Sequence, residues 1–552
     1  MMQLADTIKY LTPLVTAVAI SMALIPIMAR FAKRLGLIDR PNARKVHVDP
    51  IPRVGGIGIF GGSVISIGLL IPMDTLMSAY IAGALVLFVF GVWDDRQEIG
   101  HYVKFVGQFF AALVVVLYGD LYVKSFPFFP DSELPAVIGM PFTVIAIMGM
   151  INAINHSDGL DGLAGGESLI SMAAIAFLAH FAGGDAVLII ALALIGGIFG
   201  FLRFNTYPAK VFMGDSGSQF LGFTLAFLVI LLTQRIDTTL SPSIALLLLG
   251  LPIVDIIAVF VIRMRSGMHW FRASRNHIHH RLLDLGFVHE ESVIVIYSIQ
   301  VQCVTLGVLL RNEPDWLLVA IYLILCVGFL VVIGHAEKTG WRRNPVEQKN
   351  APIAHIDHKY LRNLLIIAPR KFLTFGIPAF LVTSSLLVEE IPRDFAVMSA
   401  LISVLIIIEM VFGRAPRSIM RRALIYITAV FVVYLGVNYP PTFTSIAEPI
   451  IALFYTLVAL SFAVAVKFSP GRRKVEFKTT NMDYLVLAVL LGSFVATKGM
   501  VFGDAAMVFA IEIIVIFYAC ELLVTESRER WNGLGAASLL TVLILSVRGI
   551  FL

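Results

Sequence analysis

The segment AVIGMPFTVIAIMGMI, residues 136–151, is apolar and nearly long enough to cross a bilayer as a helix, and NAINHSDGLDGLAGG, residues 152–166, follows it directly. The second stretch carries amides and carboxylates at intervals of three residues: Asn152, Asn155, Asp158 and Asp161. Asn152 and Asn155 share a face of the continuing helix, Asp158 follows about one turn later, and the glycines end the helix. A helix C-cap explains a glycine here, but it does not explain four polar side chains at a membrane boundary, where unpaired polar groups are costly.

The whole chain has the composition of a membrane protein. Hydrophobic residues make up 58% of it and charged residues 14%, and the mean hydropathy is +0.89, which excludes an ordinary soluble domain. Apolar runs of helical length recur along the sequence, and none alternates as the strands of a membrane barrel do. We therefore expect an all-α, polytopic integral membrane protein. The first run, 11–29, is too long for the apolar part of a cleaved signal peptide and should remain as an anchor.

Hydropathy windows of about 19 residues predict two membrane units separated by a linker. Residues 1–340 contain about eleven predicted spans: 11–29, 55–71, 77–93, 103–118, 136–151, 168–181, 186–202, 220–233, 244–262, 293–309 and 316–333. Residues 371–552 contain about seven more: 372–388, 395–412, 423–437, 446–466, 483–497, 504–523 and 533–551. The segment 341–370 between them is polar and basic, as expected of a cytoplasmic linker.

The basic residues give the orientation. If the spans alternate, the segments that flank the first eleven spans, with the linker counted among them, have 24 Lys and Arg residues on one side and 4 on the other, and the rest of the chain has 11 and 3. The positive-inside rule then places the N-terminus outside and the basic loops in the cytoplasm. We therefore expect a multi-pass protein of the inner (cytoplasmic) membrane.

The polar, motif-like segments all fall on the predicted cytoplasmic side, so they can converge on one site. They are DRPNARKVHVDPIPRVGG (39–56), WDDRQEIG (93–100), NAINHSDGLDGLAGG (152–166), RFNTYPAKVFMGDSGS (203–218) and RNHIHHRLLDLG (275–286). The loops of the other side are short and carry no comparable set. We expect the chemistry at the cytoplasmic face.

Three carboxylates in these segments have both a simple and a functional interpretation. Asp94 and Asp95 end a span, where an acidic pair often only marks the membrane boundary, yet adjacent carboxylates also suit Mg²⁺ and leave coordination positions open for phosphate. Asp215 lies between Gly214 and Ser216 just before a span. It is either an ordinary helix N-cap or a carboxylate that a ligand can approach closely.

The histidine-rich segment contains His277, His279 and His280 beside Arg275 and Arg281. The H-x-H-H spacing matches neither the HExxH motif nor a Cys/His zinc pattern. The same residues would form a cationic cradle for a diphosphate, and we favour this interpretation.

Taken together, R-K-x-H, P-x-P-R-x-G-G, W-D-D, N-x-x-N-x-x-D-G-L-D-G-L-A, F-N-x-x-P-A-K-V-F-M-G-D-S-G-S and R-N-H-I-H-H-R-L resemble one family. It is the polyprenyl-phosphate N-acetylhexosamine-1-phosphate transferase family, glycosyltransferase family 4. The resemblance covers roughly residues 1–340, and the H-I-H-H-R form is more similar to the UDP-GlcNAc branch than to phospho-MurNAc-pentapeptide translocase. Residues 341–552 have no counterpart in the usual members.

The resemblance implies transfer of N-acetylhexosamine 1-phosphate, first of all GlcNAc-1-phosphate, from a UDP-sugar to polyprenyl (undecaprenyl) phosphate. UMP would be released, and a lipid-linked cell-envelope glycan would be initiated. The implied partners are UDP-N-acetylhexosamine, polyprenyl phosphate and membrane lipid, with no nucleic acid, and a homodimer is left open. Another UDP-amino sugar or UDP-MurNAc-pentapeptide is the alternative donor. A secondary transporter is the alternative of another class, disfavoured because the motifs lie at one face and not at the midplane.

The resemblance also implies residue roles. Mg²⁺, or Mn²⁺ in its place, is expected at Asp215 with help from Asp95, and Asp94 is expected to deprotonate or position the lipid phosphate. The roles of Asp94 and Asp95 are exchangeable at this point, and a covalent mechanism through a nucleophilic Asp stays open. The expected substrate-binding residues are Lys45, His47, Asn152, Asn155, Asp158, Asp161, Asn205, His277, His279, His280 and Arg281.

Overall fold

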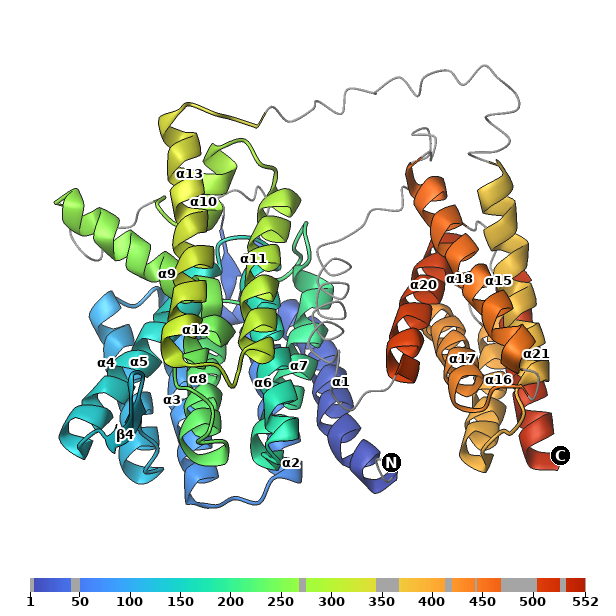
Figure 1. Ribbon diagram of the computed structural model, residues 1–552, viewed down its shortest axis with the longest axis horizontal. Coiled ribbons are helices and arrows are strands. Elements are labelled where there is room, and N and C mark those ends of the chain that lie inside the picture. The colour runs from blue at the N-terminus through green and yellow to red at the C-terminus, as the bar shows by residue number, and fades with distance from the viewer. Residues whose placement is uncertain are drawn as a thin grey trace. The chain divides into compact units, whose positions relative to one another are not determined.

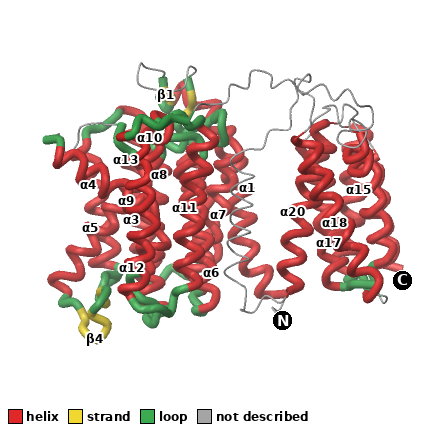
Figure 2. The backbone as a smooth tube through the Cα atoms, turned by 45° about the horizontal axis from the view of Figure 1, so that its top comes forward, coloured by secondary structure: helices red, strands yellow, loops and turns green. Residues whose placement is uncertain are grey.

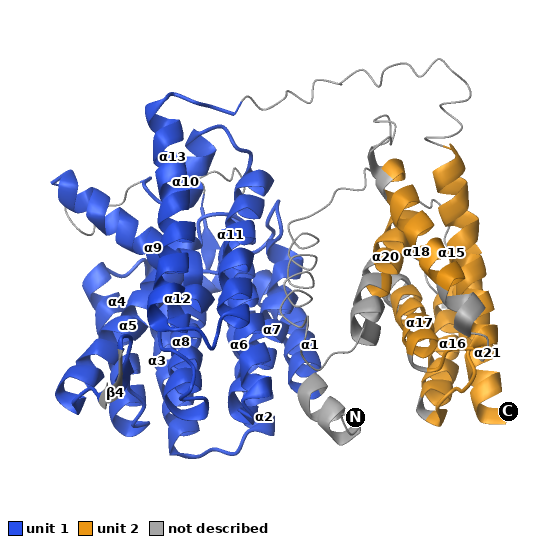
Figure 3. Ribbon diagram, in the orientation of Figure 1, with its two compact units in different colours: residues 1–345, 479–496 blue, residues 346–478, 497–552 orange. Residues whose placement is uncertain are grey.

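The computed structural model describes residues 4–40, 50–267, 275–343, 367–412, 419–441, 444–467, 504–526 and 533–551. These residues are almost entirely helical, and their strands form two short hairpins (Figure 2). The predicted all-α class is confirmed. The chain divides into two compact units, whose described residues lie within 4–343 and within 367–551 (Figure 3). Eleven described helices are long and apolar enough to cross a membrane, ten in the first unit and one in the second.

The first unit is a bundle of long helices (Figure 1). Its helices are α1 (Leu4–Leu35), α2 (Gly55–Leu70), α3 (Thr75–Gln97), α4 (His101–Leu113) with the π-helical η1 (Val114–Tyr118), α5 (Ala136–Ser157), α6 (Leu163–Phe181), α7 (Asp185–Asn205), α8 (Asp215–Leu231) with η2 (Leu232–Ile236), α9 (Ile244–Arg265), α10 (Ile278–Asp284), α11 (His289–Leu309), and α12 (Asp315–Tyr322) followed by η3 (Leu323–Val327) and α13 (Gly328–Lys338). The antiparallel hairpins are β1 (Ile38–Asp39) with β2 (Ile51–Pro52), and β3 (Ser125–Phe126) with β4 (Phe129–Glu133). Each of the eleven predicted spans of residues 1–340 corresponds to one of these helical segments.

Helix α8 is the centre of this bundle. Every residue of α8 after Asp215 is buried, as expected of a helix that is apolar on all sides. It packs against α2, α3 and α5. Tyr80 of α3 stacks on Phe227 with ring centroids 4.6 Å apart, and its hydroxyl lies 3.1 Å from Thr224 Oγ1. The packing fixes the position of Asp215, the first residue of α8.

Glycines bring two other helices against the start of α8. A Cβ on Gly56 would lie 2.2 Å from the backbone nitrogen of Gly217, and a Cβ on Gly91 would lie 2.4 Å from Ser216 Cα. Neither position can therefore carry a side chain without displacing α8. The close approach brings the W-D-D end of α3 beside the G-D-S-G-S start of α8, although about 120 residues separate them in the sequence.

Helix α9 is broken at Gly250, whose φ of 45° and ψ of −122° are not helical, and Pro252 follows. The break frees backbone groups that a membrane helix must satisfy internally. Gln300 of α11 accepts a hydrogen bond from the Leu251 backbone N–H at 3.0 Å, and the Tyr322 hydroxyl donates to the Gly250 carbonyl at 3.2 Å. Side chains of neighbouring helices thus stabilise the break.

The second unit contains α15 (Ala368–Leu387), α16 (Arg393–Phe412), α17 (Ile419–Asn438), α18 (Thr444–Lys467), α20 (Asp504–Glu526) and α21 (Gly533–Phe551). These helices correspond to six of the seven predicted spans of residues 371–552. The seventh, 483–497, lies outside the described residues, as does most of the predicted linker 341–370. Arg548 of α21 donates to the Ser385 carbonyl at the end of α15 at 2.8 Å, which joins the last helix to the first.

Candidate active site

Three carboxylates and a lysine meet where α3 ends and α8 begins, and we call this end of the first unit the site end. Lys104 Nζ, from α4, lies 2.6 Å from Asp94 Oδ2 and 2.5 Å from Asp215 Oδ2. Asp94 is only 5% exposed, and its Oδ1 has no hydrogen-bond partner within the described part of the chain. One ammonium group is thus shared by two carboxylates, and Asp95, next to Asp94, adds a third acidic group at the same helix ends. The arrangement has unused capacity for a further cation or for an acidic proton.

Asp95 is placed differently from its neighbour Asp94. Its Oδ1 accepts a hydrogen bond from the Asp215 backbone N–H at 2.8 Å, and its Oδ2 accepts from the Ser216 N–H at 3.1 Å and from the Ser216 hydroxyl at 2.8 Å. A carboxylate at this position satisfies the first backbone donors of α8 and the positive end of its dipole. Asp95 therefore fastens the end of α3 to the start of α8.

The two asparagines of the opening motif belong to the same network. Asn155 Nδ2 donates to Asp215 Oδ1 at 3.2 Å. Asn152 Nδ2 donates to Gln108 Oε1 at 2.7 Å, Gln108 lies 3.4 Å from Gln219, and Gln219 donates to Asp215 Oδ2 at 3.2 Å. Asn155 thus contacts the carboxylate directly, whereas Asn152 is linked to it through two glutamines that the sequence motifs did not single out.

Asp161 and Asn205 hold two loops of the site end together. Asp161 Oδ2 accepts from the Ala209 backbone N–H at 2.8 Å. Asn205 Oδ1 accepts from the Gly162 N–H at 2.8 Å, and its Nδ2 donates to the Val211 carbonyl at 2.9 Å. Both ends of the Asn205 amide are therefore engaged by backbone, so this side chain shapes the α5–α6 and α7–α8 loops.

Asp158 lies at the end of α5, close to the carboxylate cluster. Burial and the negative charges of Asp215 and Asp95 together raise the pKa of Asp158 to about 7, although Arg53 opposes them. For Asp158 the described residues provide no hydrogen-bond partner. It is consequently a carboxyl group that can hold or release a proton near neutral pH, beside the cluster.

The histidine segment is anchored by a carboxylate of α9. His277 Nδ1 lies 2.8 Å from Asp255 Oδ2, and the backbone N–H of Ile278 donates to Asp255 Oδ1 at 2.9 Å. His156, from the opening motif, stacks on His277 with ring centroids 4.9 Å apart and an interplanar angle of 23°. The predicted convergence of these two motifs is therefore present in the structure.

His279 and His280 lie next to each other, with ring centroids 4.2 Å apart. His279 is buried against Gly159, where a Cβ would lie 2.2 Å from His279 Nε2. Burial and the neighbouring His280 hold the pKa of His279 well below its usual range, and burial and Arg275 lower the pKa of His280. His280 Nδ1 is buried without a partner in the described residues. Both rings are therefore neutral at pH 7, so they provide N–H donors and not full positive charges.

Arg281 is directed to another helix. Its Nε and Nη2 donate to the two carboxylate oxygens of Glu337 in α13, each at 2.8 Å. This bidentate pair uses the planar fork with which arginine would bind a phosphate. The two other predicted cationic residues, Lys45 and His47, lie outside the described residues.

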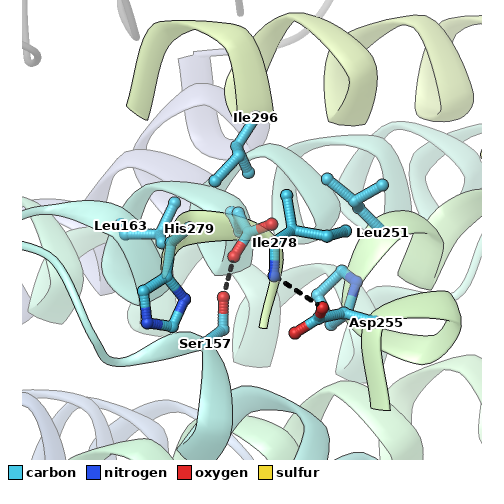
Figure 4. Close-up of a pocket in the computed structure, with 9 residues that line it drawn as sticks. Ser157, Leu163, Leu251, Asp255, Ile278, His279 and Ile296 are labelled. Atoms are coloured by element: carbon cyan, nitrogen blue, oxygen red, sulfur yellow. Dashed lines mark hydrogen bonds between the residues drawn. The ribbon is translucent and has the colours of Figure 1, made fainter. Parts of the chain in front are cut away.

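A small cavity lies beside His279, between residues of α5, α6, α9, α10 and α11 (Figure 4). Ser157 donates a hydrogen bond to Glu167, which is buried in α6. The lining residues are Ser157, Leu163, Glu167, Leu251, Pro252, Asp255, Ile278, His279 and Ile296.

Sequence reasoning missed Lys104, Asp255 and Glu167. The available signal was the presence of ionisable residues within or directly beside apolar runs, where they are rare unless they have a function or a partner.

The donor set fits Mg²⁺ in part. The described residues contain no group of three or more His, Cys, Asp or Glu side chains arranged around a metal position. Asp94 and Asp215 provide the hard oxygen ligands that Mg²⁺ prefers, and a site with two carboxylates leaves positions for water and substrate phosphate. Asp95, in contrast, would have to give up the hydrogen bonds that begin α8.

Comparison with known proteins agrees with these motifs. The model of the family "Glycosyl transferase family 4" matches residues 77–233. The probable undecaprenyl-phosphate N-acetylglucosaminyl 1-phosphate transferase of Bacillus subtilis (strain 168) is 36% identical over 337 residues, which cover 60% of this chain and 92% of the relative. The undecaprenyl-phosphate alpha-N-acetylglucosaminyl 1-phosphate transferase of Escherichia coli (strain K12) is 33% identical over 325 residues, which cover 57% and 87%. Because the chain covers nearly the full length of such relatives, it belongs to glycosyl transferase family 4, the family that its motifs resemble.

Proposed function

We propose that this protein transfers N-acetylglucosamine 1-phosphate from UDP-N-acetylglucosamine to undecaprenyl phosphate and releases UMP. The proposal rests on one observation above all: Asp94 and Asp215 face a common lysine at the end of a membrane bundle, in a chain similar to transferases named for this lipid and sugar phosphate. Residues 1–340 would carry the reaction. We further propose that the product starts a lipid-linked cell-envelope glycan.

The reaction exchanges one phosphoanhydride for another. An oxygen of the lipid phosphate attacks the phosphorus that is joined to the sugar, the new P–O bond forms, and the bond to UMP breaks. Both reactants are anions, so catalysis depends mainly on holding them in line and neutralising their charge. A water-accessible end of a membrane bundle suits this task, because the lipid tail can stay in the bilayer while the nucleotide stays in water.

The chain's own groups divide this work. Asp94 Oδ1, which is without a partner in the described residues, positions the lipid phosphate or takes its proton, and Lys104 offsets negative charge. Asn155 orients Asp215, and His279 and His280 of α10 donate to the diphosphate. Asp94 and Asp215 would hold Mg²⁺, which supplies charge neutralisation to the phosphates when bound. Asp95 keeps α3 and α8 in register.

The proposed orientation in the membrane follows from the placement of the Lys and Arg residues and from the nature of the sugar donor. The basic loops lie on the side of the site end, so by the positive-inside rule this end faces the cytoplasm of an inner-membrane protein and the N-terminus lies outside. UDP-sugars are donors of the cytoplasm, which agrees with this orientation.

The test uses the purified full-length protein in detergent with Mg²⁺, undecaprenyl phosphate and a panel of UDP-sugars. We expect UMP release that requires the lipid phosphate and is fastest with UDP-N-acetylglucosamine. Faster UMP release from UDP-MurNAc-pentapeptide or another UDP-amino sugar would show that this compound, and not UDP-N-acetylglucosamine, is the preferred donor. No UMP release with any donor, from protein that remains folded, would refute the reaction. EDTA should abolish UMP release, and Mg²⁺ or Mn²⁺ should restore it. Full activity in the presence of the chelator would refute the proposed requirement for a metal ion.

A further inference from the structure

We propose that Asp255 is a positioning residue that fixes the tautomer of His277, so that Nε2 is the ring nitrogen presented to the substrate. That a substrate binds near this ring rests on the proposed function, whereas the contact between Asp255 and His277 does not depend on it. Asp255 lies in the apolar stretch LPIVDIIAVF of α9, where an ionisable side chain calls for a partner. Asp255 and His277 are 8% and 6% exposed.

The break in α9 gives Asp255 its place. Gly250 and Pro252 interrupt the helix, and Gln300 bonds to the backbone at the break. Asp255 follows Pro252 by three residues, so its position depends on how the helix resumes. From there the carboxylate meets the first residues of α10, with Oδ2 on the His277 ring and Oδ1 on the Ile278 backbone N–H.

The chemistry of the two groups decides the tautomer. An ionised carboxylate only accepts hydrogen bonds, so at 2.8 Å His277 Nδ1 carries the proton and donates it. In the neutral form of the ring, Nε2 then holds the free lone pair, and it has no partner among the described residues. The ring is also held in orientation by its stacking on His156.

A purely structural role for Asp255 is the competing explanation, since Oδ1 alone would serve as a cap for α10. Replacement by asparagine separates the two roles. The Asn oxygen can still accept from the Ile278 N–H, but its NH₂ group then faces His277 Nδ1 and turns that nitrogen into an acceptor. Asp255→Asn should therefore keep the cap and invert the tautomer, whereas Asp255→Ala loses both.

The experiment uses full-length protein with ¹⁵N-labelled histidine at a pH near 8.5, where a histidine of ordinary pKa is neutral. His277→Gln assigns the signals. We expect ¹⁵N shifts of an Nδ1–H ring in the wild type and of an Nε2–H ring in Asp255→Asn. An Nε2–H ring in the wild type, or an unchanged tautomer in the variant, would overturn the proposal, whether or not the protein transfers sugar phosphate.

Kinetics give the second readout. Asp255→Asn should lower kcat by about 10- to 100-fold with little change in thermal stability, as for other residues that orient a histidine. The variant Asp255→Asn/His277→Gln should be no slower than His277→Gln, because Asp255 acts through that ring. The matched control is Asp315→Asn, whose carboxylate likewise accepts from a backbone N–H and a side-chain donor, and it should stay within about twofold of the wild type. Full activity of Asp255→Asn, or additive losses in the double variant, would refute the positioning role.

Discussion

The two ends of the first unit use their polar groups in different ways. At the end that carries β3 and β4, Asp315 accepts from the Phe128 backbone N–H at 2.9 Å, and Gln234 Oε1 accepts from the backbone of Lys124 and Ser125, both at 2.9 Å. At the site end, side chains of α3, α4, α5 and α8 bond chiefly to one another, and Asp94 Oδ1 is left without a partner among the described residues. Polar groups that close loops are satisfied by the chain itself at both ends, as Asn205 shows at the site end, whereas Asp94 of the site end keeps capacity for a ligand.

The largest effect is expected from Asp215→Asn. This change removes the charge that Lys104, Asn155 and Gln219 share, so UMP release should fall by about 10³-fold. Folding should be little affected, because the amide keeps the shape. Thermal unfolding of the same samples provides the control. A variant with more than about a tenth of wild-type activity would mean that the two ends of the bundle do not differ as we infer.

Lys104→Met tests the cation that already lies between the carboxylates. Methionine keeps much of the length but leaves Asp94 and Asp215 without their shared positive charge, so turnover should fall by about 10- to 100-fold. The same loss of a competing cation should strengthen metal binding. We therefore expect half-maximal activity at a lower Mg²⁺ concentration, measured by titration. A higher requirement for Mg²⁺ would show that Lys104 does not compete with the metal.

Asp95→Asn and Asp94→Asn compare two adjacent carboxylates. Asp95 is expected to stabilise the contact between α3 and α8, whereas Asp94 is expected to take part in the reaction. In Asp95→Asn an NH₂ group would face donors at the start of α8, which should lower the free energy of unfolding by about 1–3 kcal/mol. Asp94→Asn should lower it less, yet it should reduce turnover more at a temperature where both variants are folded. Equal losses of stability would contradict the assignment of Asp95 as the residue that joins α3 to α8.

Asp158 should make stability depend on pH. Its folded-state pKa of about 7 lies above that of the unfolded chain, near 4, so the folded protein binds this proton more tightly. The contribution of this group to stability is therefore lost as the pH rises from about 4 to about 7. Asp158→Asn removes the effect. Its melting temperature should exceed that of the wild type increasingly over this range, and parallel curves would refute the assignment.

The smallest effect is expected from Arg281→Lys. The arginine is already paired with Glu337, so activity should remain within about threefold and stability should fall by at most about 1 kcal/mol, as for a partly exposed pair. A large rise in KM for the UDP-sugar would show instead that Arg281 leaves Glu337 to bind the diphosphate, as the sequence motif predicts.

The sequence predicts the helices and the meeting of the motifs well, because hydropathy and Lys/Arg placement are properties of whole segments. It does not tell which polar side chain faces a ligand. Asn205 and Arg281 lie in the family motifs yet bond to the protein itself, while Lys104 and Asp255 lie in apolar runs and contact site residues. These partners depend on tertiary contacts, such as the approach of Gly91 to α8, that no local pattern encodes.

The buried course of α8 has an electrical consequence. From Phe220 to Leu231 its buried side chains are apolar apart from Thr224, whose hydroxyl bonds to the Phe220 carbonyl and to Tyr80. At 1.5 Å per residue, this stretch interposes about 18 Å of packed, low-dielectric material between the carboxylate cluster and the opposite end. Along α8 the bundle is therefore apolar from Phe220 to Leu231, and its charged groups lie at the end where α8 begins. Within the described residues, the stretch from Phe220 to Leu231 therefore provides no polar route along α8 by which protons or metal ions could pass from the carboxylate cluster to the opposite end.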